Sequence, residues 1–301
     1  MKRRHFFKIS LPFVIPCVAV EACAPRDLKP TLTFGVIADP QYADQPARGQ
    51  RHYRESLGKL KRAIDDLNQH HLDFVVTLGD VIDADFTSFK AIMPLYRALK
   101  APHQLVLGNH DFDVADQDKG KVMQAMGMPK AYYSETHGPW RFIYLDGTEV
   151  STYRYPADDP RTSAAEQRVE QLKKQTIKQA HPWNGAISED QMTWLKNELV
   201  AASSANQQVI VFCHYPVYPV DGHNLWNAEE VVELISQYPN VKAYMNGHHH
   251  KGNYGEHKGC HYVNFKGMVE TKDNSAYAVV SCFHDRIEVD GFETEPDRKL
   301  F

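Results

Sequence analysis

The sequence lacks the features that mark a nucleic-acid-binding or membrane-spanning protein. Its formal net charge is -4 over 301 residues, whereas affinity for a phosphate backbone needs a concentrated positive field. The N-terminal apolar run Ile9–Val20 is shorter than the roughly 20 residues of a transmembrane helix, and it contains Pro12 and Pro16. We therefore expect no nucleic-acid partner and no membrane-spanning helix in this run.

Several common sequence motifs and patterns are missing as well. The three cysteines that follow residue 23 are Cys213, Cys260 and Cys282, and this odd number predicts no disulfide framework. There is no Walker-type loop and no glycine fingerprint for dinucleotides, so a bound nucleotide would be held by other groups. Internal repeats and low-complexity tracts are absent too. Hydrophobic residues at 43% and charged residues at 24% are ordinary for a globular protein with a large core.

Residues 1–23 have the layout of an export leader, because basic residues precede the apolar run and the run stops at Cys23. Arg3 and Arg4 resemble the twin-arginine type of signal. The segment Val20–Cys23 resembles a lipoprotein cleavage box with Cys23 as the lipidated residue, although Glu21 departs from the usual small or apolar residue. We expect an exported protein, periplasmic or anchored in a membrane by lipid. The alternative is a leader of no consequence and a cytoplasmic protein.

From residue 31 onward, strand-like apolar runs alternate with helical stripes, which predicts the α/β class. Apolar residues three or four positions apart predict a helix within 51–70, and Ser188–Gln191 forms a capping box for another. Segment 151–187 breaks the alternation, so we expect an insertion with one solvated helix inside a single domain, residues 31–295. The predicted strands are 31–38, 73–78, 104–107, 141–145, 208–213 and 241–246, with further strand-like runs at 261–265, 276–282 and 286–289.

Residue types that bind metals follow five of these strands directly. Because ligands bind beyond the carboxyl ends of strands in open α/β sheets, these residues should converge in space. Each signal alone has a plainer explanation, since Asp39 and Asp80 suit turns and a single histidine such as His214 is most often a packed core residue. The clusters are Asp39-Pro40-Gln41, Gly79-Asp80, Gly108-Asn109-His110-Asp111, His214 and Gly247-His248-His249-His250.

In this order the clusters resemble the calcineurin-like metallophosphoesterase family, whose pattern is Asp-x-His, Gly-Asp, Gly-Asn-His-Asp/Glu, a lone His and Gly-His-x-His. The resemblance covers residues 31 to about 270. It implies a four-layer α/β/β/α sandwich with two divalent metal ions at the carboxyl ends of the strands. By correspondence, one ion would be bound by Asp39, Gln41 and His250, the other by Asn109, His214 and His248, and both by Asp80. His249 should face away from the ions.

Gln41 stands where most of the family has histidine. An amide oxygen is a hard, neutral ligand, so this exchange favours Mn²⁺ or Mg²⁺ over Zn²⁺ or Fe. The exchange also marks a subgroup, because Gly35–Asp44, His214–Pro219, Trp226-Asn227 and Tyr262–Phe265 resemble the manganese-dependent ADP-ribose/CDP-alcohol diphosphatases. That resemblance implies Mn²⁺ as the metal and a small nucleotide-linked diphosphate as the substrate.

A two-metal centre needs no covalent protein nucleophile, because water activated by the ions attacks phosphorus in line with the leaving oxygen. His110 is the expected proton donor to the leaving oxygen, and Asp111 is expected to fix the His110 tautomer. Cys213 has no paired base in the sequence and is not expected to act as a nucleophile. Residues suited to stacking or phosphate contact, several of which would simply pack, are Tyr42, Arg51, Tyr218, Trp226 and Tyr254.

Three alternatives remain open at this point. The same centre could serve a phosphomonoesterase, or a phosphodiesterase acting on cyclic nucleotides or phospholipids. A different class is a non-catalytic metal-binding scaffold that uses the fold as an interaction surface, against which the intact ligand set and His110 argue. The sequence predicts no oligomeric state.

Overall fold

The computed structural model describes Met1 and residues 29–301. The rest of the predicted leader, with Arg3, Arg4 and Cys23, lies outside the described residues, so export and lipidation stay predictions. Among the described helices, none is both long enough and apolar enough to cross a membrane.

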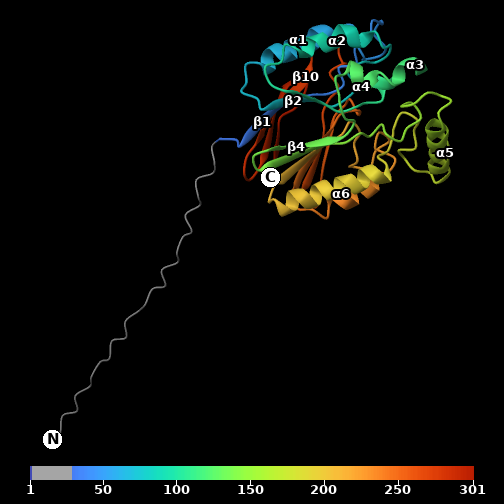
Figure 1. Cartoon of the computed structure of the whole chain (residues 1–301). Helices are drawn as coiled ribbons and strands as arrows, with labels where there is room; N and C mark the ends of the chain where they lie inside the picture. The colour runs from blue at the N-terminus through green and yellow to red at the C-terminus, as the bar shows by residue number, and fades with distance from the viewer. Residues whose placement is uncertain (2–28) are drawn as a thin grey trace.

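Two six-stranded sheets lie face to face (Figure 1). The first has the order β12-β11-β10-β1-β2-β3, and the second β4-β5-β6-β7-β9-β8. The parallel strands are β1 (Leu32–Ile37), β2 (Phe74–Thr77) and β3 (His103–Leu105) in the first sheet, and β5 (Trp140–Tyr144), β6 (Gln208–Phe212), β7 (Val241–Asn246) and β9 (Cys260–Asn264) in the second. The antiparallel strands are β10 (Ala276–Cys282), β11 (Ile287–Glu293) and β12 (Arg298–Leu300), and β4 (Tyr133–His137) and β8 (Asn253–His257).

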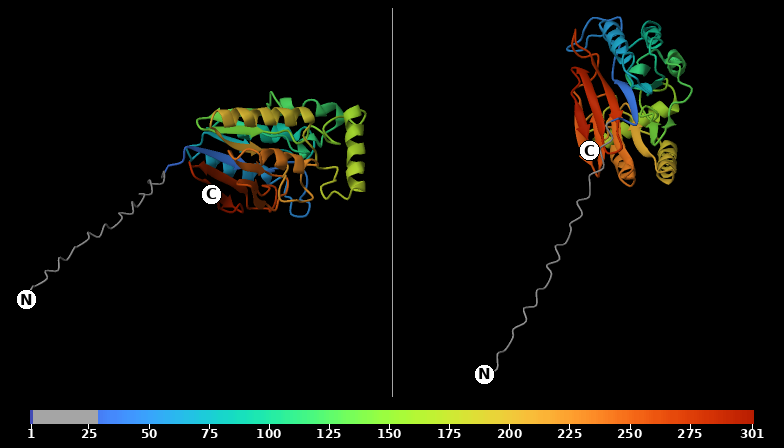
Figure 2. Two further views of the ribbon diagram at one scale, coloured as in Figure 1. Left: turned by 90° about the horizontal axis from the view of Figure 1, so that it is seen from below. Right: turned by 90° about the vertical axis from the view of Figure 1, so that its left-hand side faces the viewer.

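Helices cover the outer face of each sheet, which gives the four-layer α/β/β/α sandwich that the resemblance implies (Figures 1 and 2). The first sheet is covered by α1 (Ser56–Leu67), α2 (Ser88–Tyr96) and the short α4 (Val122–Ala125), while the short α3 (Asp116–Lys119) buries no residue. The second is covered by α6 (Glu189–Ser204) and α7 (Ala228–Ile235). Helix α5 (Pro160–Lys174) stands at one end of the molecule, and a short 3-10 helix, η1, spans His110–Phe112.

The core between the sheets explains why the central strands read as continuous apolar runs. In β1, Phe34 faces the other sheet while Ile37 packs under the helices, so both faces of the strand are buried. Phe34 stacks on Phe74 of β2 with ring centroids 4.8 Å apart, and Phe142 of β5 meets Phe34 edge-on at 5.6 Å. These aromatic contacts join β1, β2 and β5 in the core between the two sheets.

The structure differs from the sequence prediction at the edges of the sheets. Strands β4 and β8 were not predicted, because their half-exposed polar residues carry no apolar run. Strand β12 pairs with β11, so the domain reaches Leu300 and the predicted end at residue 295 is too early. The predicted insertion does carry one helix, α5, but its Ala165 and Val169 are buried against Trp226 rather than solvated.

The predicted capping box is only half formed. The Ser188 hydroxyl accepts a hydrogen bond from the Gln191 backbone N–H at 3.1 Å, as expected for an N-cap. The Gln191 side chain turns inward instead of returning to Ser188, and it exchanges two hydrogen bonds with the backbone of Asp146, at 2.8 and 3.0 Å. The helix therefore begins where the sequence predicts, while its glutamine anchors α6 to the end of β5.

Candidate metal centre

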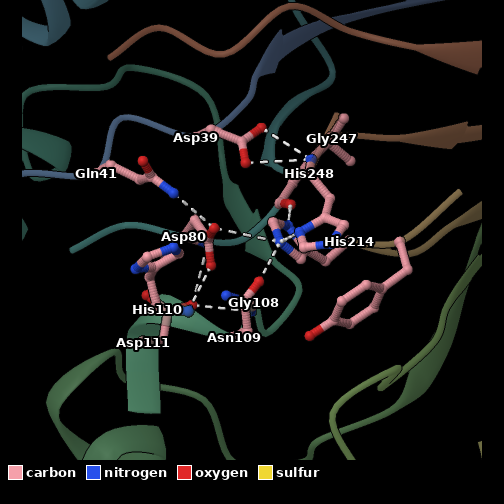
Figure 3. A network of polar contacts seen from close by, with 12 residues as sticks. Asp39, Gln41, Asp80, Gly108, Asn109, His110, Asp111, His214, Gly247 and His248 are labelled. Carbon is pink, nitrogen blue, oxygen red and sulfur yellow. Dashed lines mark hydrogen bonds and ion pairs between the residues drawn. The ribbon is translucent and has the colours of Figure 1, made fainter. Parts of the chain in front are cut away.

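The seven predicted ligands come together at the edge where the parallel strands end, and Figure 3 shows all of them except His250. The ligands form two groups, and within each group the potential ligand atoms all lie within 4.8 Å of one another. One group is Asp80 with His214 and His248, and the other is Asp80 with Asp39 and His250. Asp80 belongs to both groups, as expected for a bridging carboxylate. None of the seven side chains is more than 9% exposed, and so many buried polar groups need compensating partners.

The backbone at this edge is held in a sparsely populated conformation. Four of the predicted ligands have positive φ without being glycine: Asp39 (49°), Gln41 (42°), Asp80 (51°) and His248 (65°). Each such residue costs on the order of 1–3 kcal/mol and persists only where its surroundings fix it, which is typical of functional sites. The tight turns explain how residues two positions apart, such as Asp39 and Gln41, reach the same centre.

Two motif glycines make room for the carboxylates. A Cβ atom on Gly108 would collide with the Asp80 carboxylate, and one on Gly247 would collide with the Asp39 carboxylate. The glycines of the sequence clusters therefore serve close approach, because any side chain at either position would fill the space that the acidic oxygens occupy.

Two of the histidines have a tautomer fixed by the protein. His214 Nδ1 lies 2.7 Å from the Leu78 carbonyl oxygen, which only accepts, so this nitrogen donates. His250 Nδ1 lies 2.8 Å from Glu270 Oε1 and donates likewise. The Nε2 atom of each ring is left to face the acidic cluster, at 3.3 Å from Asp80 Oδ2 and 3.4 Å from Asp39 Oδ1 respectively. Outer hydrogen bonds of this kind orient histidines as metal ligands.

His248 is oriented by Asn184, a residue that the sequence analysis missed. His248 Nε2 lies 2.9 Å from Asn184 Oδ1, which leaves Nδ1 to face the centre at 3.1 Å from His214 Nε2. The amide nitrogen of Asn184 donates to the carbonyl oxygens of Gln179 and Gly222 at 3.0 and 2.7 Å, so the amide cannot turn over without losing these bonds. Asn184 lies in segment 151–187, where no local pattern indicates a role at the centre.

We predict that Asn184→Ala weakens Mn²⁺ binding about 10- to 100-fold, because the His248 ring loses the acceptor that fixes its tautomer. Isothermal titration calorimetry on the metal-stripped protein measures this directly. Asn240→Ala is the matched control, since Asn240 donates to the Gln207 carbonyl at 2.8 Å in another part of the fold. Equal affinities in the two variants would show that Asn184 does not support the metal centre.

The charges at the centre require a positive partner. Burial would raise the pKa of Asp80, but His214 and His110 hold that pKa well below its usual range. Burial would lower the pKa of His214, yet the Asp80 carboxylate raises it to about 9. A protonated His214 thus supplies positive charge beside Asp80 when no cation is bound. Binding of a metal ion would displace that proton.

The donor set itself fits hard divalent cations. Carboxylate and amide oxygens are combined with three imidazole nitrogens, a mixture that suits Mn²⁺. Gln41 Nε2 donates to Asp80 Oδ2 at 2.8 Å, while Gln41 Oε1 is buried and has no hydrogen-bond partner among the described residues. Rotating the Gln41 amide by half a turn would present Oε1 to a cation beside Asp80. That cation would then be a partner for both the Gln41 oxygen and the Asp80 carboxylate. The predicted ligands therefore fit a pair of divalent ions.

His110 and Asp111 differ in role from the sequence prediction. His110 lines the metal cavity, and its Nδ1 lies 3.1 Å from the carbonyl oxygen of Asp83 and 3.3 Å from Asp83 Oδ1. Asp111 makes no contact with the His110 ring; its carboxylate accepts hydrogen bonds from the backbone N–H groups of Val81, Gly108 and Asp80 at 2.8, 2.9 and 3.1 Å. The prediction that Asp111 fixes the His110 tautomer is wrong, because Asp83 does so.

Most of the predicted substrate-contact residues pack instead. Trp226 is buried, Tyr218 packs on Tyr262, and Tyr42 packs beneath the helices of the first sheet. Tyr254 is exposed but bonds His261 at 2.9 Å, outside the cavities of the metal centre. Arg51 alone among these candidates lines the centre.

Two further expectations hold. His249 belongs to neither group of ligand atoms around Asp80, and it stacks on His223 with ring centroids 4.4 Å apart. Cys213 is buried, and burial raises the pKa of its thiol to about 11, which agrees with the absence of a nucleophilic role.

The ligands open into two adjoining cavities. The metal cavity has a volume of about 340 Å³ and is lined by Gln41, Asp80, Asn109 and His110, among others. A larger cavity of about 620 Å³, which we call the basic cleft, is lined by Arg48, Arg51, Lys251 and Lys266 beside Glu270. The two share Arg51, His223, His248 and His250, so a ligand at the metals can extend directly into the basic cleft.

Comparison with known proteins agrees with this site. Residues 32–252 match the family model described as calcineurin-like phosphoesterase. A protein from Arabidopsis thaliana is 30% identical over 294 residues, covering 87% of this chain and 94% of the relative. One from Mus musculus is 31% identical over 327 residues, covering 91% and 95%. Both are named manganese-dependent ADP-ribose/CDP-alcohol diphosphatase.

Among solved structures, a dimetal phosphatase from Danio rerio superposes with a TM-score of 0.81 at 23% identity, over 90% of this chain and 99% of that one. This likeness supports the fold. Because the family model spans most of the chain and every cluster of the motif order lies at the predicted edge, this chain belongs to the calcineurin-like phosphoesterases and is a metal-dependent hydrolase.

Proposed function

We propose that the protein hydrolyses the diphosphate bond of nucleotide-linked compounds such as ADP-ribose and CDP-alcohols, using two Mn²⁺ ions. The observation that carries this proposal is the pair of relatives named for this activity, which align over nearly their whole length at 30% and 31% identity. ADP-ribose would yield AMP and ribose 5-phosphate, and a CDP-alcohol would yield CMP and a phosphorylated alcohol.

Each residue of the centre has a defined task in this reaction. Asp39, Gln41 and His250 would hold one ion, Asn109, His214 and His248 the other, and Asp80 both. When bound, two such ions neutralise phosphate oxygens and lower the pKa of a water molecule between them. His110 Nδ1–H donates a hydrogen bond to the Asp83 carbonyl oxygen, so Nε2 is the nitrogen left for the substrate. The imidazolium form of the ring can donate its Nε2 proton to the leaving oxygen and keep the Nδ1 proton.

The basic cleft favours a diphosphate over a phosphomonoester. Four cationic side chains, Arg48, Arg51, Lys251 and Lys266, face one carboxylate, Glu270, which already accepts a hydrogen bond from His250. A local excess of positive charge on a chain of net charge -4 concentrates the field at this place. A diphosphate carries a second phosphate that can occupy the cleft, whereas a small phosphomonoester would leave it unfilled.

A substrate panel tests the proposal. The metal-stripped protein is incubated with Mn²⁺, Mg²⁺ or Zn²⁺ and with ADP-ribose, CDP-choline, p-nitrophenyl phosphate or a cyclic nucleotide, and the products are separated by chromatography. We expect AMP with ribose 5-phosphate, and CMP with phosphocholine, fastest with Mn²⁺. The Asn109→Ala variant, purified in the same way, controls for contaminating hydrolases. Consumption of the monoester or the cyclic nucleotide while both diphosphates stay intact would refute the proposal.

A further inference from the structure

An exposed tryptophan lies at the mouth of the metal cavity. Trp183 is 45% exposed and lines this cavity together with Gln41, Asp80, Asn109 and His110. Among the exposed large hydrophobic side chains in the described part of the chain, Trp183 is the one that lines the metal cavity. A large aromatic ring left in water beside a catalytic centre marks a contact surface for a ligand.

One face of the Trp183 ring is already supported by the protein. The His181 ring stacks on it with centroids 4.2 Å apart and an interplanar angle of 8°. The carbonyl oxygen of His181 in turn accepts a hydrogen bond from Trp226 Nε1 at 3.0 Å, and Trp226 is buried. The second face of the Trp183 ring is thus the one that a ligand can cover.

The backbone on the other side of Trp183 is fixed to the metal centre. The next residue, Asn184, is fully buried, bonds two carbonyl oxygens through its amide nitrogen and meets His248 through its oxygen. Trp183 therefore has a defined position relative to the predicted metal ligands. Such a fixed aromatic ring can bind a flat partner with little loss of conformational freedom.

We propose that the free face of Trp183 stacks on the nucleobase of the substrate and so selects nucleotide-linked compounds over base-free ones. Stacking tolerates any base, because every base has a π-face. One platform can therefore accept both adenine and cytosine, which matches the two substrate classes of the proposed function on which this inference rests. Trp183 does not line the basic cleft, so a substrate that contacts both extends across the metal centre.

The kinetic test compares ADP-ribose with an analogue in which hydrogen replaces adenine. Trp183→Ala is expected to raise KM for ADP-ribose about 5- to 150-fold, with kcat within about twofold of the parent, since base stacking is lost while the metals stay in place. The kcat/KM for the base-free analogue should be the same in both proteins, and Trp183→Phe should retain most of the affinity. An unchanged KM, or an equal loss on both substrates, would overturn the inference.

A binding experiment separates this inference from the proposed function, because it needs no turnover. AMP and CMP are titrated into the Mn²⁺-loaded protein, and quenching of tryptophan fluorescence is followed in the parent, in Trp183→Phe and in Trp194→Phe. Trp194 is the matched control, because it lies in α6, packs on Tyr132 and lines neither cavity. We expect quenching to disappear in Trp183→Phe alone. If it persists there, Trp183 is not the stacking residue, whether or not ADP-ribose is hydrolysed. Quenching that depends on Trp183 in a protein inert toward ADP-ribose would refute only the proposed function.

Discussion

His110→Ala is expected to lower kcat for ADP-ribose about 10²- to 10⁴-fold, the usual contribution of a positioned proton donor. The backbone N–H of His110 donates to Asp80 Oδ1 at 2.8 Å, and alanine preserves this bond. The His110 ring contacts Asp83, which is not one of the predicted metal ligands, and it lines the metal cavity. The variant should therefore keep its fold and its Mn²⁺ affinity while it loses the proton donor.

The leaving group provides the decisive comparison. Two aryl esters of AMP, both cleaved between phosphorus and the aryl oxygen, differ in the basicity of the phenolate that leaves. Because p-nitrophenolate needs a proton far less than phenolate does, His110→Ala should slow hydrolysis of the p-nitrophenyl ester far less than that of the phenyl ester. Single-turnover rates at saturating Mn²⁺ report the chemical step, and calorimetry confirms metal loading. An equal loss on the two substrates would mean that His110 acts by another route than proton transfer.

Asp111→Asn is expected to lower the free energy of unfolding by about 3–5 kcal/mol, because two buried backbone N–H groups would lose their acceptor at about 1–3 kcal/mol each. Asp111 is fully buried, and one of its oxygens accepts from the N–H groups of Gly108 and Asp80 at 2.9 and 3.1 Å. An asparagine bonded to Val81 through its oxygen would turn an NH₂ group toward those two donors. For a domain of this size the loss corresponds to a fall in Tm of roughly 6–20 °C.

Urea denaturation of the metal-stripped protein measures this change without a contribution from bound ions. Asp83→Asn is the control, because Asp83 contacts the His110 ring and should alter turnover with little effect on unfolding. The reverse pattern, a fully stable Asp111→Asn protein with slow turnover, would return Asp111 to the role of orienting His110.

The metal ligands were predictable from the sequence because each lies a few residues after a strand and because the order of the clusters resembles that of a known family. Asp39 comes two residues after β1 and His214 two residues after β6, and parallel strands bring such ends to one edge. The fold class was predictable for a related reason, since the central strands are buried on both faces and read as apolar runs. The polar edge strands β4 and β8 had no such signal.

The residues that orient the ligands were decided only by the tertiary structure. Asn184 meets His248 across 64 positions of the chain, and Asp83 meets His110 across 27. Local periodicity and spacing contain no information about contacts between loops so far apart. Asp111 is an example of two sequence neighbours that do not interact through their side chains. It follows His110 directly, but the turn of η1 directs the Asp111 carboxylate to backbone N–H groups instead. The sequence by itself determined which atoms can bind the metals, and the packing of the loops decided which groups hold those atoms in place and where a substrate can lie.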